Sequence, residues 1–258
     1  MRVAENIPYK PGSTHTKHLL DVYTPDGPNT NPVLIFVHGG SWYTGCKEWY
    51  QQLGRHLAEK NIVCVVINYR LGADATYEAM ADDVALAVKW TSENIHKYQG
   101  DRQKIFISGH SAGGHLSALI SLNLRFYKAL GITNPAKGCV LIDAFGMNMD
   151  YVMQNNNAFF VKELKSVFGN NPEKWKDAAP VKFVTQGALP FLILTGSNTY
   201  PYMTLDNQFF KMSLEAHQVP FTYKTIPGRN HTEMITSLKD PNDPVYGDIL
   251  GFMENYMP

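Results

Sequence analysis

The sequence has no excess of either charge. Its 258 residues include 23 Lys and Arg and 23 Asp and Glu, so the formal net charge is zero. Nucleic-acid-binding domains usually carry a basic face, because their binding neutralises backbone phosphates. The balanced composition therefore predicts no nucleic-acid partner.

Cysteine is also scarce. The three cysteines, Cys46, Cys64 and Cys139, are far apart and form no C-x-x-C motif. An odd number at this spacing argues against a disulfide framework and against a zinc site. Cys64 and Cys139 lie in apolar runs and are expected to be small core residues.

Long apolar runs and repeats are missing as well. No run approaches the roughly 20 apolar residues of a membrane span, and the start, MRVAENIPYK, lacks the apolar region of a signal peptide. We therefore expect no membrane partner and a cytoplasmic location, or a secreted or periplasmic one if a leader has been removed. The length and the 44% hydrophobic content suit one domain, residues 1–258, and leave the oligomeric state open.

The chain does contain alternating strand-like and helix-like segments. Runs rich in β-branched residues predict strands at 18–23, 33–37, 62–68, 104–108, 139–142, 191–195 and 221–226. The clearest helical pattern covers residues 77–98, and others begin near Lys47, Ala112, Leu205 and Tyr246. This order predicts an α/β fold with a mostly parallel, doubly wound sheet and helices on both faces. The long irregular stretch 145–184 predicts a small lid-like excursion over the carboxyl edge of the sheet.

The segment GHSAGG, residues 109–114, follows an apolar strand-like run and opens a helical one. A sharp strand-to-helix turn crowds its central residue, and small neighbours two positions away relieve the clash. Gly109 and Gly113 supply these neighbours around Ser111. The pattern predicts a nucleophile elbow, with a Gly-rich turn or a phosphate cradle as the alternatives.

A second motif, His38-Gly39-Gly40-Ser41-Trp42, ends another buried strand about 70 residues earlier. Two glycines after a strand let backbone N–H groups turn toward one point, where an acyl-transfer enzyme holds an oxyanion. The predicted donors are the N–H groups of Gly40 and Ser41, joined by that of Ala112 after the nucleophile.

Histidine supplies the expected base. Of nine histidines, His231 follows the last predicted strand and the turn PGRN, from where it can reach over the sheet edge toward Ser111. His110 and His115 flank the elbow and are not expected to reach the Ser111 hydroxyl, and His38 is expected to brace the glycine turn. Ser111 and His231 are therefore the predicted nucleophile and base.

Together, the segments LDVYTPDG, PVLIFVHGGSWYTGCK, VINYRL, DDVALAVKW, ISGHSAGGHLSALI and IPGRNHTEM resemble the α/β-hydrolase superfamily. They are most similar to its small carboxylesterases, near the hormone-sensitive-lipase-like and bacterial feruloyl-esterase-like families. The resemblance implies an α/β-hydrolase fold and a serine hydrolase with the chain order nucleophile, acid, histidine. It also implies that Asp82 and Asp83 are scaffold residues.

The acid departs from the family pattern. The resemblance implies an aspartate three residues after Gly196, where this chain has Thr199. Two carboxylates could substitute: Asp206 at the start of the next helix, which the prediction favours slightly, and Asp143 at the end of the preceding strand. Loss of the acid is the third possibility.

The expected substrate is a small soluble ester of the acetyl, short acyl or feruloyl type, with no metal or organic cofactor because a triad needs none. Trp42, Tyr43 and Tyr200 fall on loops at the carboxyl edge and are predicted to contact substrate, with simple rim packing as the alternative. Two other functions stay open: an arylformamidase-like amide hydrolase, because relatives of that activity share the H-G-G-x-W turn, and a hydrolase-fold binding protein with an impaired triad.

Overall fold

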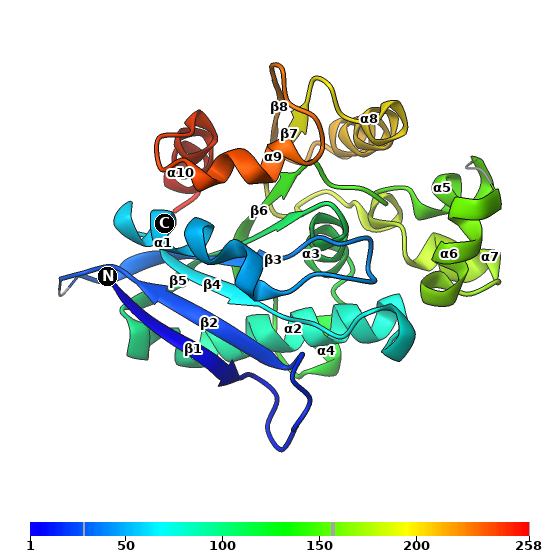
Figure 1. Cartoon of the computed structure of the whole chain (residues 1–258). Coiled ribbons are helices and arrows are strands. Elements are labelled where there is room, and N and C mark those ends of the chain that lie inside the picture. The colour runs from blue at the N-terminus through cyan, green and yellow to red at the C-terminus, as the bar shows by residue number, and fades with distance from the viewer. Residues whose placement is uncertain (28, 156–157, 258) are drawn as a thin grey trace.

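The computed structural model describes residues 1–27, 29–155 and 158–257. Within them, eight strands form one sheet in the order β1-β2-β4-β3-β5-β6-β7-β8 (Figure 1). The strands are β1 (Arg2–Pro8), β2 (Leu19–Thr24), β3 (Asn31–Val37), β4 (Val63–Ile67), β5 (Gly100–His110), β6 (Ala136–Ile142), β7 (Phe191–Gly196) and β8 (Phe221–Ile226). Strands β4, β3, β5, β6, β7 and β8 run parallel, which confirms the predicted α/β class.

The N-terminal edge of the sheet is antiparallel. β1 pairs with β2, and β2 pairs with β4, both in antiparallel register. Strand β1 is not among the predicted strands, because its residues RVAENIP form no continuous apolar run and none of them is fully buried.

Helices cover both faces of the sheet (Figure 1). The α-helices are α1 (Gln51–Glu59), α2 (Tyr77–Asn94), α3 (Ala112–Leu122), α4 (Arg125–Ala129), α5 (Met149–Asn155), α6 (Ala158–Phe168), α7 (Pro172–Asp177), α8 (Pro201–Ala216), α9 (Glu233–Thr236) and α10 (Pro244–Asn255). Short 3₁₀ helices are η1 (Lys47–Tyr50), η2 (Gly72–Asp74), η3 (Ile95–Tyr98), η4 (Pro180–Phe183) and η5 (Ser237–Lys239). The helix predicted at 77–98 is confirmed as α2 continued by η3.

The strand pattern explains the two cores. Along β3, Val33, Ile35 and Val37 pack in one cluster with side chains of α2 and α3. Leu34 and Phe36, which point to the opposite face, pack in a second cluster with side chains of α1 and α10. This period of two is what a strand covered on both faces requires. Cys64 is buried in the second cluster, and Cys139 is buried in a third, smaller one. Both are free thiols.

The excursion at 145–184 is more regular than predicted. It contains α5, α6, α7 and η4, and residues 156 and 157 within it lie outside the described part of the chain. In α6, Leu164, Val167 and Phe168 are buried, so one side of this helix packs on the body of the protein. The sequence predicts an irregular stretch here because Asn-rich and Pro-containing segments interrupt the apolar pattern.

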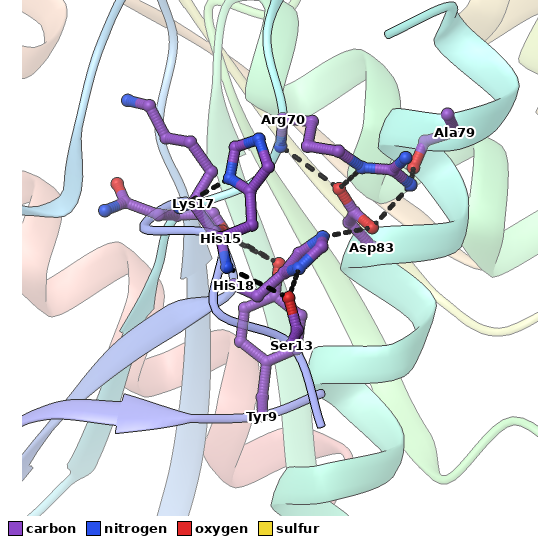
Figure 2. A network of polar contacts seen from close by, with 9 residues as sticks. Tyr9, Ser13, His15, Lys17, His18, Arg70, Ala79 and Asp83 are labelled. Atoms are coloured by element: carbon purple, nitrogen blue, oxygen red, sulfur yellow. Dashed lines mark hydrogen bonds and ion pairs between the residues drawn. The ribbon is translucent and has the colours of Figure 1, made fainter. Parts of the chain in front are cut away.

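A buried polar network fastens the segment between β1 and β2 to helix α2 (Figure 2). Arg70 donates from Nε to Asp83 Oδ2 at 2.7 Å and from Nη2 to Oδ1 at 2.8 Å. His18 Nε2 lies 3.1 Å from Asp83 Oδ1, and Ser13 Oγ lies 2.5 Å from His18 Nδ1. Asp83 is 1% exposed, so its charge needs these partners. It has the scaffold role that the resemblance implies, while Asp82 beside it is exposed.

Among the described residues, no helix combines the length and apolar character needed to cross a bilayer.

Candidate active site

Four chain segments meet at the carboxyl ends of the parallel strands. Ser111 follows β5, Asp143 follows β6, His231 follows β8 and the glycine turn at 38–42 follows β3. Strands of one parallel sheet end at the same edge, which is where α/β proteins bind ligands. Residues far apart in sequence are therefore brought together here.

Ser111 has the backbone of a nucleophile elbow. Its φ is 54° and ψ is −122°, a strained conformation for a residue with a side chain. A Cβ on Gly109 would lie 2.4 Å from the Gly113 carbonyl, and a Cβ on Gly113 would lie 2.1 Å from the Val37 carbonyl oxygen. Only glycine fits at either position, so the turn depends on both.

His231 links the serine to a carboxylate. Its Nε2 lies 3.0 Å from Ser111 Oγ, and its Nδ1 lies 2.6 Å from Asp143 Oδ2. The loop is fixed by Asn230, whose side-chain oxygen accepts from the N–H groups of Thr232 and Glu233 at 3.0 and 2.9 Å. The imidazole is 20% exposed, which leaves it open to a ligand.

Asp143 is fully buried and has several partners. Gly196 N–H donates to Oδ1 at 3.1 Å, and the Thr199 hydroxyl donates to Oδ2 at 2.5 Å. β5 and β6 are hydrogen-bonded neighbours with His110 opposite Ile142, so Ser111 and Asp143 leave adjacent strands at the same level.

The structure does not support the preference for Asp206 as the acid. Asp206 is 1% exposed on α8, and its carboxylate accepts from the N–H groups of Gly146, Met147 and Asn148 at 2.7 to 2.8 Å. These bonds fasten the start of the excursion. Burial raises the pKa of Asp206 to about 6, against the opposing effect of the three amides. The alternative acid, Asp143, is the carboxylate that contacts His231.

The glycine turn has unusual backbone geometry at the predicted oxyanion donors. Gly40, Ser41 and Trp42 have φ values of 125°, 52° and 64°. A Cβ on Gly40 would lie 2.2 Å from the Thr44 carbonyl oxygen. Within the described part of the chain, the N–H groups of Gly40, Ser41 and Ala112 donate no hydrogen bond to the protein, which leaves them for a ligand.

A cavity of about 440 Å³ opens beside Ser111 and His231. Gly40 and Ser41 line it together with these two residues, whereas Ala112 is not among its lining residues. Its far wall is largely apolar and comes from η1, α1, α9 and η5: Trp49, Tyr50, Leu53, Ile235 and Leu238. The site can therefore hold an uncharged organic group against the serine hydroxyl.

Of the three predicted substrate-contact residues, Trp42 is contradicted. It is 1% exposed, donates from Nε1 to His115 Nδ1 at 3.3 Å and packs edge-on against Phe168. The side chain therefore packs in the core and does not line the cavity.

The two tyrosines lie nearer the site. Tyr43 lines a second cavity that shares Gly40 and Ser41 with the first, and its hydroxyl contacts the Glu163 carbonyl and the Ser166 hydroxyl on α6. Tyr200 is 53% exposed, with its ring centroid 6.0 Å from that of His231, but it does not line the first cavity.

His110 contacts the base, although the sequence predicted only that it flanks the elbow. Its ring stacks on His231 at a centroid distance of 4.6 Å, and its Nε2 lies 3.2 Å from the His231 carbonyl oxygen. Burial, with the nearby His231 acting in the same direction, lowers the pKa of His110 to about 3. A neutral ring therefore supports His231. Its place directly before Ser111 is the signal that could have pointed to it.

Two further buried histidines hold the site together. His115 lies 2.7 Å from the Ala178 carbonyl oxygen, and His38 lies 2.8 Å from the Gly39 carbonyl oxygen, where it braces the glycine turn as expected. Burial lowers the pKa of each to about 4.

These three histidines make stability depend on pH. Between pH 6.5 and about 4, the unfolded chain takes up protons on them that the folded chain does not bind, so stability is full above pH 6.5 and falls as the pH is lowered. Each contributes up to about 1.4 kcal/mol per pH unit to the free energy of unfolding. Asp206 acts in the opposite sense: because its pKa is raised to about 6, the folded chain binds a proton there below about pH 6, which offsets the contribution of one histidine. Urea unfolding between pH 7 and 5 measures the net slope.

Two variants control this prediction. His115→Gln is expected to reduce the slope by one histidine's share, whereas His217→Gln, on an exposed side chain, should leave it unchanged. A free energy of unfolding that stays constant from pH 7 to 5 would contradict the prediction.

Across residues 1–27, 29–155 and 158–257, no group of three or more His, Cys, Asp or Glu side chains is arranged to hold a metal ion.

Curated relatives of this chain include esterases. Esterase LipC of Mycobacterium tuberculosis (strain ATCC 25618 / H37Rv) is 34% identical over 83% of this chain and 56% of its own length. The probable isoprenylcysteine alpha-carbonyl methylesterase ICMEL2 of Arabidopsis thaliana is 28% identical over 88% of this chain and 57% of its own length. The chain thus spans little more than half the length of these relatives.

Solved structures show the same fold. Esterase B from Lactobacillus Rhamnosis (HN001) superposes with a TM-score of 0.84 at 19% identity, covering 99% of this chain and 86% of that one. A truncated carbohydrate esterase from gut microbiota gives 0.84 at 20% identity, covering 100% of this chain and 96% of that one. These likenesses confirm the α/β-hydrolase fold.

The family model described as BD-FAE matches residues 20–201, a stretch that includes the glycine turn, the elbow, Asp143 and Thr199. The resemblance to the small carboxylesterases of the α/β-hydrolase superfamily is thereby confirmed, and the chain belongs to the BD-FAE family.

Proposed function

We propose that this chain hydrolyses carboxylic esters through an acyl-enzyme on Ser111. The observation that carries the proposal is the continuous contact from Ser111 Oγ to His231 Nε2, at 3.0 Å, and from His231 Nδ1 to Asp143 Oδ2, at 2.6 Å, beside a cavity. The esterase relatives support ester hydrolysis as the reaction class.

Asp143 fixes the tautomer of the base in this mechanism. An ionised carboxylate only accepts hydrogen bonds, so His231 carries its proton on Nδ1 and presents the Nε2 lone pair to the serine. Ser111 Oγ attacks the ester carbonyl carbon while its proton passes to Nε2. The imidazolium then protonates the leaving alcohol, and water repeats the sequence to release the acid.

The tetrahedral intermediates carry negative charge on the former carbonyl oxygen. The N–H groups of Gly40, Ser41 and Ala112, which have no partner in the described protein, are the proposed donors to that oxygen. Gly40 and Ser41 belong to the turn with positive φ values, and Ala112 is the first residue of α3, where a helix leaves its N–H groups without an internal acceptor.

The proposed substrate is a small soluble ester with an acetyl, short acyl or feruloyl group. An apolar wall that includes Trp49, Tyr50 and Leu53 suits the uncharged part of such a molecule. Tyr200 beside His231 and Tyr43 in the adjoining cavity are the proposed contacts for the rest of the substrate. Residues 1–258 act in this proposal as one α/β-hydrolase domain.

The alternative of a binding protein with an impaired triad depended on a missing acid. The contact between Asp143 and His231 counts against that alternative. Amide cleavage would use the same three groups, so the turnover of an ester and an amide must be compared to distinguish the two reactions.

The test is labelling with a fluorophosphonate, together with turnover of p-nitrophenyl acetate and formanilide. We expect one adduct, located by mass spectrometry on the peptide containing Ser111, and faster turnover of the ester. Folded protein that takes no label would favour the binding-protein reading. Preferred turnover of formanilide would favour the amide hydrolase.

A further inference from the structure

Thr199 touches the acid of the proposed triad but has no part in the reaction described so far. Its hydroxyl donates to Asp143 Oδ2 at 2.5 Å, and the same oxygen accepts from His231 Nδ1 at 2.6 Å. The other oxygen, Oδ1, accepts from Gly196 N–H at 3.1 Å. The oxygen that faces the base is therefore shared between two donors.

The position of Thr199 is set by its surroundings. Its backbone N–H donates to the Gly196 carbonyl at 3.3 Å, and its side chain also contacts Met203 Sδ at 3.9 Å. The residue is 9% exposed, so bulk water has little access to this hydroxyl. A hydrogen bond to a carboxylate is strong when water is excluded, so the Thr199 hydroxyl acts strongly on the charge of Asp143.

We infer that Thr199 is a positioning residue that holds the Asp143 carboxylate and limits how much of its negative charge acts on His231. Donation to an ionised carboxylate stabilises the charge on that carboxylate and weakens its attraction for another donor. The His231 imidazolium formed in each half-reaction is consequently less stabilised than by an unshared carboxylate. This inference rests on the proposed function.

Other titratable and charged groups also lie around His231. His110 stacks on it from β5, Tyr200 and Tyr202 lie at the start of α8, Glu233 bonds to Asn230 N–H, and Lys239 lines the cavity. The variants below leave all of them unchanged. A change confined to residue 199 therefore reports on the shared carboxylate.

The first test compares Thr199→Val with Thr199→Ser. Valine has nearly the same shape and no hydroxyl, whereas serine keeps it. We expect the acidic limb of kcat/KM against pH to move to higher pH in Thr199→Val by roughly 0.5 to 1 unit, because the imidazolium gains stability. Thr199→Ser should follow the wild-type profile. KM should stay the same in both, since residue 199 does not line the cavity.

The second test needs no catalysis. The proton between His231 Nδ1 and Asp143 gives a downfield proton NMR signal, assigned by its loss in His231→Gln. We expect this signal to move further downfield in Thr199→Val and to stay in place in Thr199→Ser. If Thr199→Val does not fold, Thr199→Ala, which also lacks the hydroxyl, is expected to show both shifts.

The outcomes separate the two proposals. A signal that moves in a protein inactive on esters would support the role of Thr199 and count against ester hydrolysis. An active enzyme in which the pH profile and the signal of Thr199→Val coincide with those of the wild type would overturn the inference about Thr199 alone.

Discussion

Replacing Ser111 with alanine is expected to slow hydrolysis of a short p-nitrophenyl ester by roughly 10⁴- to 10⁶-fold. The substitution removes the proposed nucleophile and the 3.0 Å contact with His231 Nε2. The fold should survive, because alanine keeps the Cβ that the turn already accommodates. His231→Ala should cause a comparable loss, and the double variant should be hardly slower than either single one, since the two groups act as a unit.

Ser117→Ala is the matched control. Ser117 lies six residues further along, on α3, and its hydroxyl donates to the carbonyls of Ser108 and Gly113, at 3.2 and 2.8 Å. It is buried and does not contact the cavity, so the same substitution there should leave the rate unchanged. Near-wild-type turnover by Ser111→Ala would show that the elbow does not supply the nucleophile.

Asp143→Asn is expected to lower the rate by up to about 10⁴-fold, the size of effect known when a triad acid becomes an amide. The amide cannot hold the Nδ1 proton of His231 in the way a carboxylate does, so the base loses its tautomer. Asp206→Asn should instead leave the rate nearly unchanged and cost about 1 to 3 kcal/mol of stability, because the amide leaves backbone N–H donors without an acceptor. Rates and urea unfolding of both variants distinguish the roles. A slow Asp206→Asn with a fast Asp143→Asn would reverse the assignment.

Adding Thr199→Asp to Asp143→Asn extends this comparison. The Thr199 hydroxyl lies 2.5 Å from Asp143 Oδ2, so a carboxylate at position 199 lies close to the position from which Oδ2 accepts the His231 proton. We expect the double variant to recover part of the lost rate. On the wild-type background, Thr199→Asp would bring two carboxylates together, and one of them would hold a proton. A double variant no faster than Asp143→Asn alone would show that position 199 cannot supply the acid.

Local patterns predicted the parts of the site that depend on neighbours in sequence. The elbow is such a part, since its strain at Ser111 is relieved by glycines two positions away. His231 was identifiable because only it, among nine histidines, follows the last strand and a tight turn. The central strands β3, β4, β6 and β7 were predictable because strands buried on both faces are continuous apolar runs.

The acid was harder because its identity depends on distances across strands. Asp143 directly follows β6 and Asp206 lies inside α8, and nothing in the sequence tells which carboxylate faces His231. The three N–H donors that hold Asp206 come from residues 146–148, about 60 positions away. Trp42 shows the same limit: its side chain is buried, and an aromatic residue after a glycine turn can point toward the core or toward solvent.

The ladder between β5 and β6 has a practical consequence for anyone redesigning this protein. With His110 opposite Ile142, a single strand spacing sets the separation of Ser111 from Asp143. Positions 200 to 202, at the start of α8 after β7, carry no group of the proposed triad, and Tyr200 and Tyr202 are 53% and 40% exposed. A library that varies positions 200 and 202 can therefore change which molecules the protein selects while the reacting groups keep their spacing.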